Sequence, residues 1–325
     1  MTDFQTQDSA RTFGDWAAIA IAKHARKIFK YESDVLKDKD PEDLHQMRVG
    51  MRRLRTAVVS FDRAIELPSE VAEKKIGKLA RILGSLRDLD VLQEAIETQY
   101  IPSVSPDEQK ELKRAIKALK KRRKIAIDRV RETLKGDRYH SFKEALQLWL
   151  EDPKFKAIAD VAIETVLPDV LLPEIANFLL HPGWWIGVSL NEGTVRFHEL
   201  LSPEAVRDLL DRQGEILHDL RKEAKRTRYQ MELFPQFYNE TYSDFVRYIK
   251  QTQEVLGNIQ DGFVFAEFLT DVLKVDASET MPELTARIID LRYQQWQEWE
   301  SLQRQFLDVQ NRQYLRAIVQ HPSDK

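Results

Sequence analysis

An internal repeat constrains the fold of this chain more than any other feature of its sequence. When the sequence is shifted by 173 residues, HQMRVGMRRLRTAVVSF (residues 45–61) aligns without gaps with HDLRKEAKRTRYQMELF (residues 218–234). Over residues 45–91 the shift gives ten identities in 47 positions, whereas chance gives roughly one in sixteen at ordinary composition. A segment of this length that occurs twice predicts a duplicated architecture with pseudo-two-fold symmetry.

The periodicity of the chain is that of helices. Apolar residues recur at mixed three- and four-residue spacing, and the 325 residues include only 11 glycines and 12 prolines. This pattern argues against a β-sandwich or barrel. We predict an all-α fold of antiparallel helical bundles. The helices are expected at about residues 12–37, 41–66, 70–83, 87–99, 106–134, 139–152, 155–180, 203–234, 240–256, 260–274 and 282–319.

Several small or acidic residues mark expected helix ends. Asp40, which is followed by proline, is typical of the start of a helix. Gly84 and Gly257 occupy equivalent repeat positions, and each suits a tight turn between two helices. Asp88 and Asp261 follow them by four residues. Each aspartate suits the positive end of the next helix or an arginine partner.

Composition excludes several classes of function. The chain has no cysteine, which excludes disulfides, thiolate nucleophiles and Cys-ligated zinc. We see no signal peptide, and no apolar run reaches about 18 residues, so no membrane span is expected and the cytoplasm is the default location. Lysines and arginines number 50 and acids 53, a net charge of −3. Only the distribution of charge along the chain is therefore informative.

Each copy of the repeat carries a row of cations on one helix face. Offsets of 0, 3, 7 and 10 residues fall within an arc of roughly 80°. The first stripe consists of His45, Arg48, Arg52 and Arg55, and the second stripe of His218, Arg221, Lys225 and Arg228. Arg53 and Arg226 sit to one side of these rows. Met47, Met51, Leu54 and Val58 supply the apolar face of the first copy.

Such rows favour a polyanionic partner. Like charges at i,i+4 destabilise a helix by a few tenths of a kcal/mol each, and a bound polyanion relieves this repulsion. The planar fork of arginine gives bidentate, charge-assisted hydrogen bonds to phosphate. Histidine can donate to an oxyanion, and its pKa rises beside bound phosphate. The alternative is a solvated basic face that is neutralised by acids elsewhere.

A second basic block, KELKRAIKALKKRRKIAIDRVR, covers residues 110–131. Lysines that share one helix face are Lys113, Lys117, Lys120 and Lys124. A long basic helix is more often simply solvated, but this one could extend a polyanion track.

The paired segments resemble a known family. LHQMRVGMRRLRTAVVSF and LHDLRKEAKRTRYQMELF resemble the signature helices of the CHAD family, the conserved-histidine α-helical domain. LARILGSLRDLDVLQEAI and TQEVLGNIQDGFVFAEFL resemble the segments that follow them. The resemblance implies one domain over residues 12–317, built from repeats at about 12–150 and 151–317. It also implies two four-helix bundles around a basic groove or pore.

The resemblance further implies binding of inorganic polyphosphate, and some family members localise to polyphosphate granules. By motif position, the anion-contacting residues are expected to be His45, Arg48, Arg52, Arg53, Arg55, His218, Arg221, Lys222, Lys225, Arg226 and Arg228. Weaker candidates on the following helices are Lys74, Lys78 and Arg247.

The stretch 165–203 departs from the family pattern because it is longer and more apolar. Pro168 and Pro173 are expected to interrupt its helix, and Asn191-Glu192-Gly193 to turn a small hairpin. The stretch could be an insertion, a lid on the groove or a surface for a homo-oligomer. CHAD domains often accompany a triphosphate-tunnel catalytic domain, for which this chain has no fitting segment.

The sequence therefore favours a non-catalytic polyphosphate-binding protein without metal or cofactor. One alternative is an enzyme that acts on polyphosphate or another phosphorylated polyanion, although no Walker loop or metal-binding histidine motif is present. Another is a nucleic-acid binder, which is disfavoured because aromatic residues do not alternate with the stripes. A purely structural or adaptor role is a further alternative.

Overall fold

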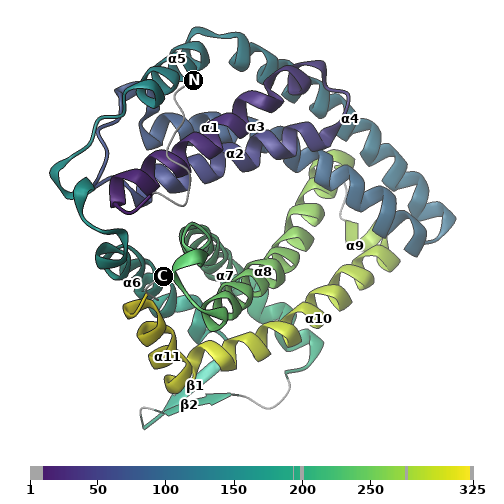
Figure 1. Ribbon diagram of the computed structural model, residues 1–325. Coiled ribbons are helices and arrows are strands. Elements are labelled where there is room, and N and C mark those ends of the chain that lie inside the picture. The colour runs from purple at the N-terminus through teal and green to yellow at the C-terminus, as the bar shows by residue number, and fades with distance from the viewer. Residues whose placement is uncertain (1–9, 193, 198–200, 275–276, 323–325) are drawn as a thin grey trace. The chain divides into compact units, whose positions relative to one another are not determined.

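The computed structural model describes residues 10–192, 194–197, 201–274 and 277–322, which are mostly helical (Figure 1). The prediction of a helical fold is confirmed. The longer helices are α1 (Phe13–Lys37), α2 (Pro41–Ser60), α3 (Glu73–Ala95), α4 (Pro106–Lys135), α5 (Asp137–Glu151), α6 (Ile163–Leu180), α7 (Pro203–Met231), α8 (Glu240–Leu273), α10 (Pro282–Leu307) and α11 (Val309–Gln320). The short helix α9 covers Ala277–Thr280, and an antiparallel hairpin pairs β1 (Val188–Asn191) with β2 (Thr194–Phe197). None of the helices described is long and apolar enough to cross a bilayer.

The chain divides into two compact units. The first unit comprises Met1–Pro102 and Ile116–Val166, and the second comprises Ser103–Ala115 and Leu167–Lys325. Helix α4 begins in the second unit and continues into the first, whereas α6 begins in the first and continues into the second. The predicted repeats at 12–150 and 151–317, their bundle symmetry and their common groove stay predictions.

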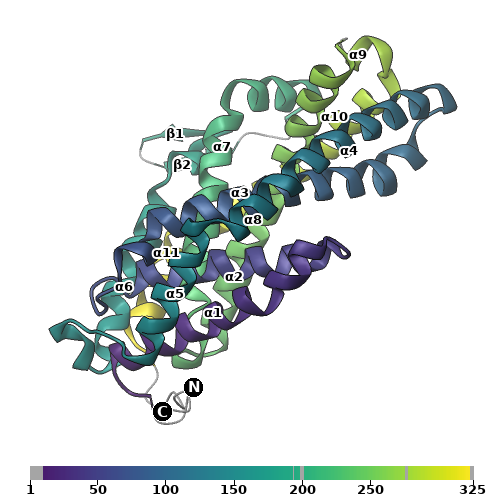
Figure 2. The same ribbon diagram turned by 90° about the horizontal axis from the view of Figure 1, so that it is seen from above.

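In the first unit, α1 and α2 run side by side (Figure 2). Helix α2 begins as predicted, with the Asp40 side chain accepting a hydrogen bond from the Glu42 N–H and Pro41 in the first turn. The two helices approach closely at Gly50. A Cβ atom at Gly50 would lie only 2.9 Å from Cγ1 of Ile28. This close packing determines which face of α2 remains accessible.

The two turns predicted at glycines are wrong. Gly84 lies inside α3 and Gly257 inside α8, and each helix continues without a break through its glycine. Each glycine follows a buried leucine, Leu83 or Leu256, and no proline or cap stops the helix. Burial of one continuous face outweighs the cost of about 1 kcal/mol that a glycine imposes on a helix interior.

Two predicted helix ends are also wrong. Helix α2 ends at Ser60 rather than near residue 66, because Ile65 instead forms an isolated β-bridge with Phe155. The last predicted helix divides at Asp308, whose side chain accepts a hydrogen bond from the Asn311 N–H and caps α11. An aspartate at this position starts a new helix at an angle to the old one.

The apolar stretch 165–203 contributes to the core of the second unit. Contrary to the prediction, Pro168 and Pro173 do not interrupt α6. The apolar side chains of the helix are buried on both sides of the two prolines, which keeps it continuous. Trp184 is fully buried and stacks on Trp299, with ring centroids 5.0 Å apart. The predicted hairpin is present, although Gly193 of its turn lies outside the described residues.

Candidate anion-binding site

The first stripe borders the buried face of α2. The predicted apolar face is buried over its whole length, at Met47, Met51, Leu54 and Val58. The stripe residues are half-buried at His45, Arg48 and Arg52 and exposed at Arg55. The cations therefore emerge at the border between the core and the solvent, where their charge is only partly screened by water.

Arg48 lies across the neighbouring helix α3 at Gly84. A Cβ atom at Gly84 would be 3.3 Å from Nε and 3.6 Å from Nη2 of Arg48. Asp88, one helical turn beyond the glycine, places Oδ1 3.7 Å from the same Nη2. Of the two roles predicted for Asp88, that of an arginine partner is the one it has. The Arg48 side chain is 23% exposed and the Asp88 side chain 73%, so the guanidinium group is reachable from solvent.

Arg55 repeats this arrangement seven residues along α2. A Cβ atom at Gly77 would lie 3.5 Å from Nε of Arg55, and Gly77 precedes Gly84 by seven residues on α3. Arg55 also forms an ion pair with Glu73 in the first turn of α3. The charge of Arg55 is thus already compensated within the protein, without an external anion.

Arg87 is a candidate residue that the sequence did not reveal. The antiparallel register that sets Arg48 against Gly84 sets Arg87 of α3 opposite His45. Nε of Arg87 is buried and, within the described part of the chain, has no hydrogen-bond partner. Arg87 is also among the charges that lower the pKa of His45, after burial and the opposing charge of Glu42. The sequence could have indicated Arg87 through this register. Because a turn was wrongly predicted at Gly84, Arg87 was not expected on the same continuous helix.

The second stripe shows the same contact of arginine with glycine. Arg221 of α7 lies against Gly257 of α8, where a Cβ atom would be 3.0 Å from Nε and 3.3 Å from Nη2. Among the residues that the structure describes, Nε of Arg221 and Nδ1 of His218 are buried without a hydrogen-bond partner. Buried polar atoms without a partner are uncommon in folded proteins, and a bound ion is one explanation for them.

Carboxylates compensate Arg228 of the second stripe and its neighbours Arg226 and Lys222. Nε of Arg226 lies 3.6 Å from Glu174 of α6, and Arg226 also pairs with Glu223. Other pairs join Lys222 to Asp219 at 2.8 Å and Arg228 to Glu232 at 3.3 Å. The second copy therefore contains more internal ion pairs than its sequence suggests. Arg221 and His218 are the members best placed to meet an anion.

Arg53 has a different setting, although it occupies the same repeat position as Arg226. It lies near α1, whose lysines Lys23 and Lys27 flank the buried His24. Burial, and next the charge of Arg53, lower the pKa of His24 to about 3. Arg53 is half-buried, as are Arg52 and Lys225. Arg53, Lys23 and Lys27 thus place three positive charges around His24.

The weaker candidates do not form the contact with a helix glycine that Arg48 and Arg221 form. Lys74 and Lys78 are exposed on α3, and Arg247 pairs with Asp244 at 2.8 Å. In the basic block, Lys113, Lys117, Lys120 and Lys124 are all exposed, which fits the interpretation of a solvated helix. Arg123 in the same block is instead an internal ion-pair partner of the first unit.

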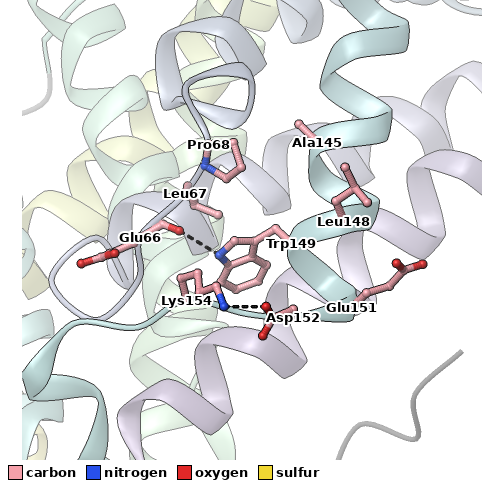
Figure 3. A pocket seen from close by; sticks show the side chains of 9 residues that line it. All are labelled: Glu66, Leu67, Pro68, Ala145, Leu148, Trp149, Glu151, Asp152 and Lys154. Carbon is pink, nitrogen blue, oxygen red and sulfur yellow. Dashed lines mark hydrogen bonds and ion pairs between the residues drawn. The ribbon is translucent and has the colours of Figure 1, made fainter.

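A pocket elsewhere in the first unit does not suit a polyanion. It lies between the loop at residues 66–68 and the end of α5, with a volume of about 630 Å³ (Figure 3). Its rim carries the carboxylates of Glu66, Glu151 and Asp152, and its one lysine, Lys154, pairs with Asp152. Across the described ranges, no three His, Asp or Glu side chains gather in a way that could hold a metal ion.

A family model for the CHAD domain matches residues 19–270 of the chain. The chain belongs to the CHAD domain family. Among solved structures, the CHAD domain from the plant Ricinus communis matches with a TM-score of 0.60 and 21% identity over 95% of this chain and 92% of that one. PptA from Streptomyces chartreusis matches with a TM-score of 0.57 and 15% identity, over 94% and 100% of the two chains. At these identities the likeness shows the fold alone. The comparison with curated proteins found no match.

Both stripes and the residues that face them fall within the CHAD match. Arg87, Gly84 and Gly257 lie inside residues 19–270, whereas α10 and α11 lie beyond its end. The contacts between arginine and glycine are thus part of the CHAD region of this chain.

Proposed function

We propose that this CHAD protein binds inorganic polyphosphate without catalysing its breakdown. One observation carries the proposal: each unit holds an arginine of its stripe against a helix glycine, beside buried guanidinium or imidazole nitrogens that have no partner in the described residues. A phosphate chain offers closely spaced, singly charged oxyanions that can complete these hydrogen bonds. We place the protein in the cytoplasm, at polyphosphate granules where such granules form.

Charge and hydrogen bonding both support phosphate as the ligand. Arginine matches the tetrahedral oxyanion with parallel N–H donors. Hydrogen bonds that involve a charged group contribute about 1.5–3 kcal/mol each. A polymer that engages several cations at once gains from each of them, and it releases the counterions condensed along its chain.

Titration of the full chain with long-chain polyphosphate tests the proposal. By analogy with nucleic acids, six phosphate contacts should weaken binding on the order of a thousandfold between roughly 50 and 200 mM salt. The affinity is measured by calorimetry at several salt concentrations. A chain that fails to bind long-chain polyphosphate at low salt would refute the proposal.

Two alternatives are separated by simple assays. An enzyme acting on polyphosphate would release phosphate in the presence of magnesium or manganese and lose this turnover in His45→Ala. A nucleic-acid binder would let single-stranded DNA displace polyphosphate at comparable concentration. The proposal expects no phosphate release and poor competition by DNA. A homo-oligomer stays a prediction that the mass of the complex in solution tests.

Polyphosphate affinity is expected to rise as the pH falls below neutral. Burial is the largest cause that lowers the pKa of both His45 and His218 in the free protein, so both are neutral at pH 7. A bound polyanion raises both pKa values, so binding takes up protons and becomes tighter at lower pH. Other charges that influence the two histidines come from Glu42, Arg87, Arg52, Arg48, Lys222, Arg221, Asp219 and Glu215.

The size of this effect is limited by linkage to at most about tenfold per pH unit for each histidine. Calorimetry in buffers of different ionisation enthalpy measures the proton uptake directly. The control is His45→Gln with His218→Gln, in which the pH dependence should be largely lost. An affinity of the unmodified chain that stays constant or rises with pH would contradict the prediction.

A further inference from the structure

Gly84 and Gly257 occupy positions where glycine has no advantage for the helix itself. Both lie in the interior of long helices, α3 and α8, and neither has a positive φ. Glycine lowers helix stability relative to alanine at such positions. A physical reason for glycine must therefore come from the neighbouring helix.

The neighbour in both cases is the stripe arginine at the same repeat position. A Cβ atom would approach Arg48 Nε to 3.3 Å at Gly84 and Arg221 Nε to 3.0 Å at Gly257. Both distances are tighter than ordinary van der Waals contact, so the guanidinium group must shift by a few tenths of an ångström to make room for an added methyl group. The missing side chain leaves a notch that each guanidinium group occupies.

Asp88 further restricts the arginine of the first unit. It follows Gly84 by one helical turn and places its Oδ1 3.7 Å from Nη2 of Arg48. The Nε–Nη2 edge of the guanidinium group thus faces the glycine, and a carboxylate lies near its Nη2 atom. A flexible arginine loses considerable rotamer freedom when it binds an anion. An arginine ordered in advance loses less.

We propose that Gly84 and Gly257 are positioning residues that order Arg48 and Arg221 for bidentate contact with phosphate oxygens. This inference rests on the proposed function, because it assigns these arginines to the phosphate chain. At Gly77 a Cβ atom would meet Arg55 Nε only at an ordinary van der Waals distance of 3.5 Å, and the equivalent of Gly77 in the second copy is Lys250. The notch at Gly84 and Gly257 is the one that both copies share.

The test is the double variant Gly84→Ala/Gly257→Ala in the full chain. Its melting temperature should stay the same or rise, because alanine favours the helix and an arginine side chain can move aside. Its affinity for long-chain polyphosphate should fall about tenfold, which corresponds to the loss of about one charge-assisted hydrogen bond. This combination of retained stability and weaker binding is not expected from a merely structural glycine.

Gly262→Ala is the matched control. Gly262 lies in α8, and its Cβ atom would meet Cδ of Arg292 at 3.3 Å, an arginine outside both stripes. It should leave polyphosphate affinity unchanged. A double variant that binds polyphosphate as tightly as the unmodified chain would overturn the inference and leave the proposed function intact.

A second measurement does not depend on the ligand. Relaxation of the Nε–Hε groups by NMR reports the order of Arg48 and Arg221 in the free protein. Both groups should be ordered in the unmodified chain and more mobile after Gly84→Ala/Gly257→Ala. If the unmodified chain binds no polyphosphate, the proposed function falls, and the NMR result alone decides whether the glycines order the arginines. Equal mobility in both proteins would refute that ordering.

Discussion

Replacing Arg48 and Arg221 together with alanine is expected to weaken binding of long-chain polyphosphate about a hundredfold. Each change removes at least one charge-assisted hydrogen bond, which accounts for about tenfold in affinity. Each arginine lies against a glycine of the facing helix, so neighbouring side chains cannot easily take its place. Calorimetry at fixed pH and salt measures the change, and circular dichroism confirms that the helices persist.

The matched control is Arg63→Ala with Arg212→Ala. It also removes two positive charges, one from each unit, but both residues are exposed and lie outside the stripes. Its affinity should fall much less, because screened surface charges contribute little. Equal losses in the two double variants would mean that only net charge matters. No loss in Arg48→Ala/Arg221→Ala would remove the stripes from the site.

Replacing Arg123 with alanine is expected to lower the free energy of unfolding by about 3 kcal/mol. Its guanidinium group makes two hydrogen bonds of 2.7 Å to Asp38 and one of 2.6 Å to Asp90. The side chains of Arg123, Asp38 and Asp90 are 22%, 19% and 6% exposed. Removing the arginine leaves two poorly hydrated carboxylates close together, and breaking such a buried pair costs about 3–5 kcal/mol.

Urea unfolding followed by circular dichroism measures this loss. Lys120→Ala is the control, because Lys120 is an exposed lysine of the same helix. The control should change the unfolding free energy by no more than about 0.5 kcal/mol. Arg123→Ala should leave polyphosphate affinity unchanged under conditions where the chain is folded. An unfolding free energy equal to that of the unmodified chain would show that the two aspartates do not depend on Arg123.

The sequence predicted those parts of the site that depend on one helix at a time. The start of α2 follows from Asp40 and the proline after it, and its apolar face from the spacing of residues such as Met47 and Leu54. The placement of cations beside that face follows from the same helical geometry. Local spacing determines these features, so they need no knowledge of the partner helix.

The parts that the sequence did not predict depend on which helices meet. Glu174 is distant in sequence from Arg226, and only packing of α6 on α7 brings the two together. Gly84 suggested a turn, since the guanidinium group that requires its small size belongs to another helix. Arg87 was missed for the same reason, because its relation to His45 exists only when α3 is continuous.

The ion pairs of the second copy have a consequence for the kind of ligand that can bind there. Arg226, Arg228 and Lys222 each have a carboxylate within 4 Å in the free protein. These carboxylates are tethered to the same chain, so they act at a high effective concentration. An incoming anion must exchange with them rather than fill an empty position. A single phosphate group can displace only one such carboxylate at a time. When a polymer is already bound at Arg221, its next phosphate groups are tethered too and also act at a high effective concentration. The internal carboxylates therefore disfavour the binding of short anions relative to long ones.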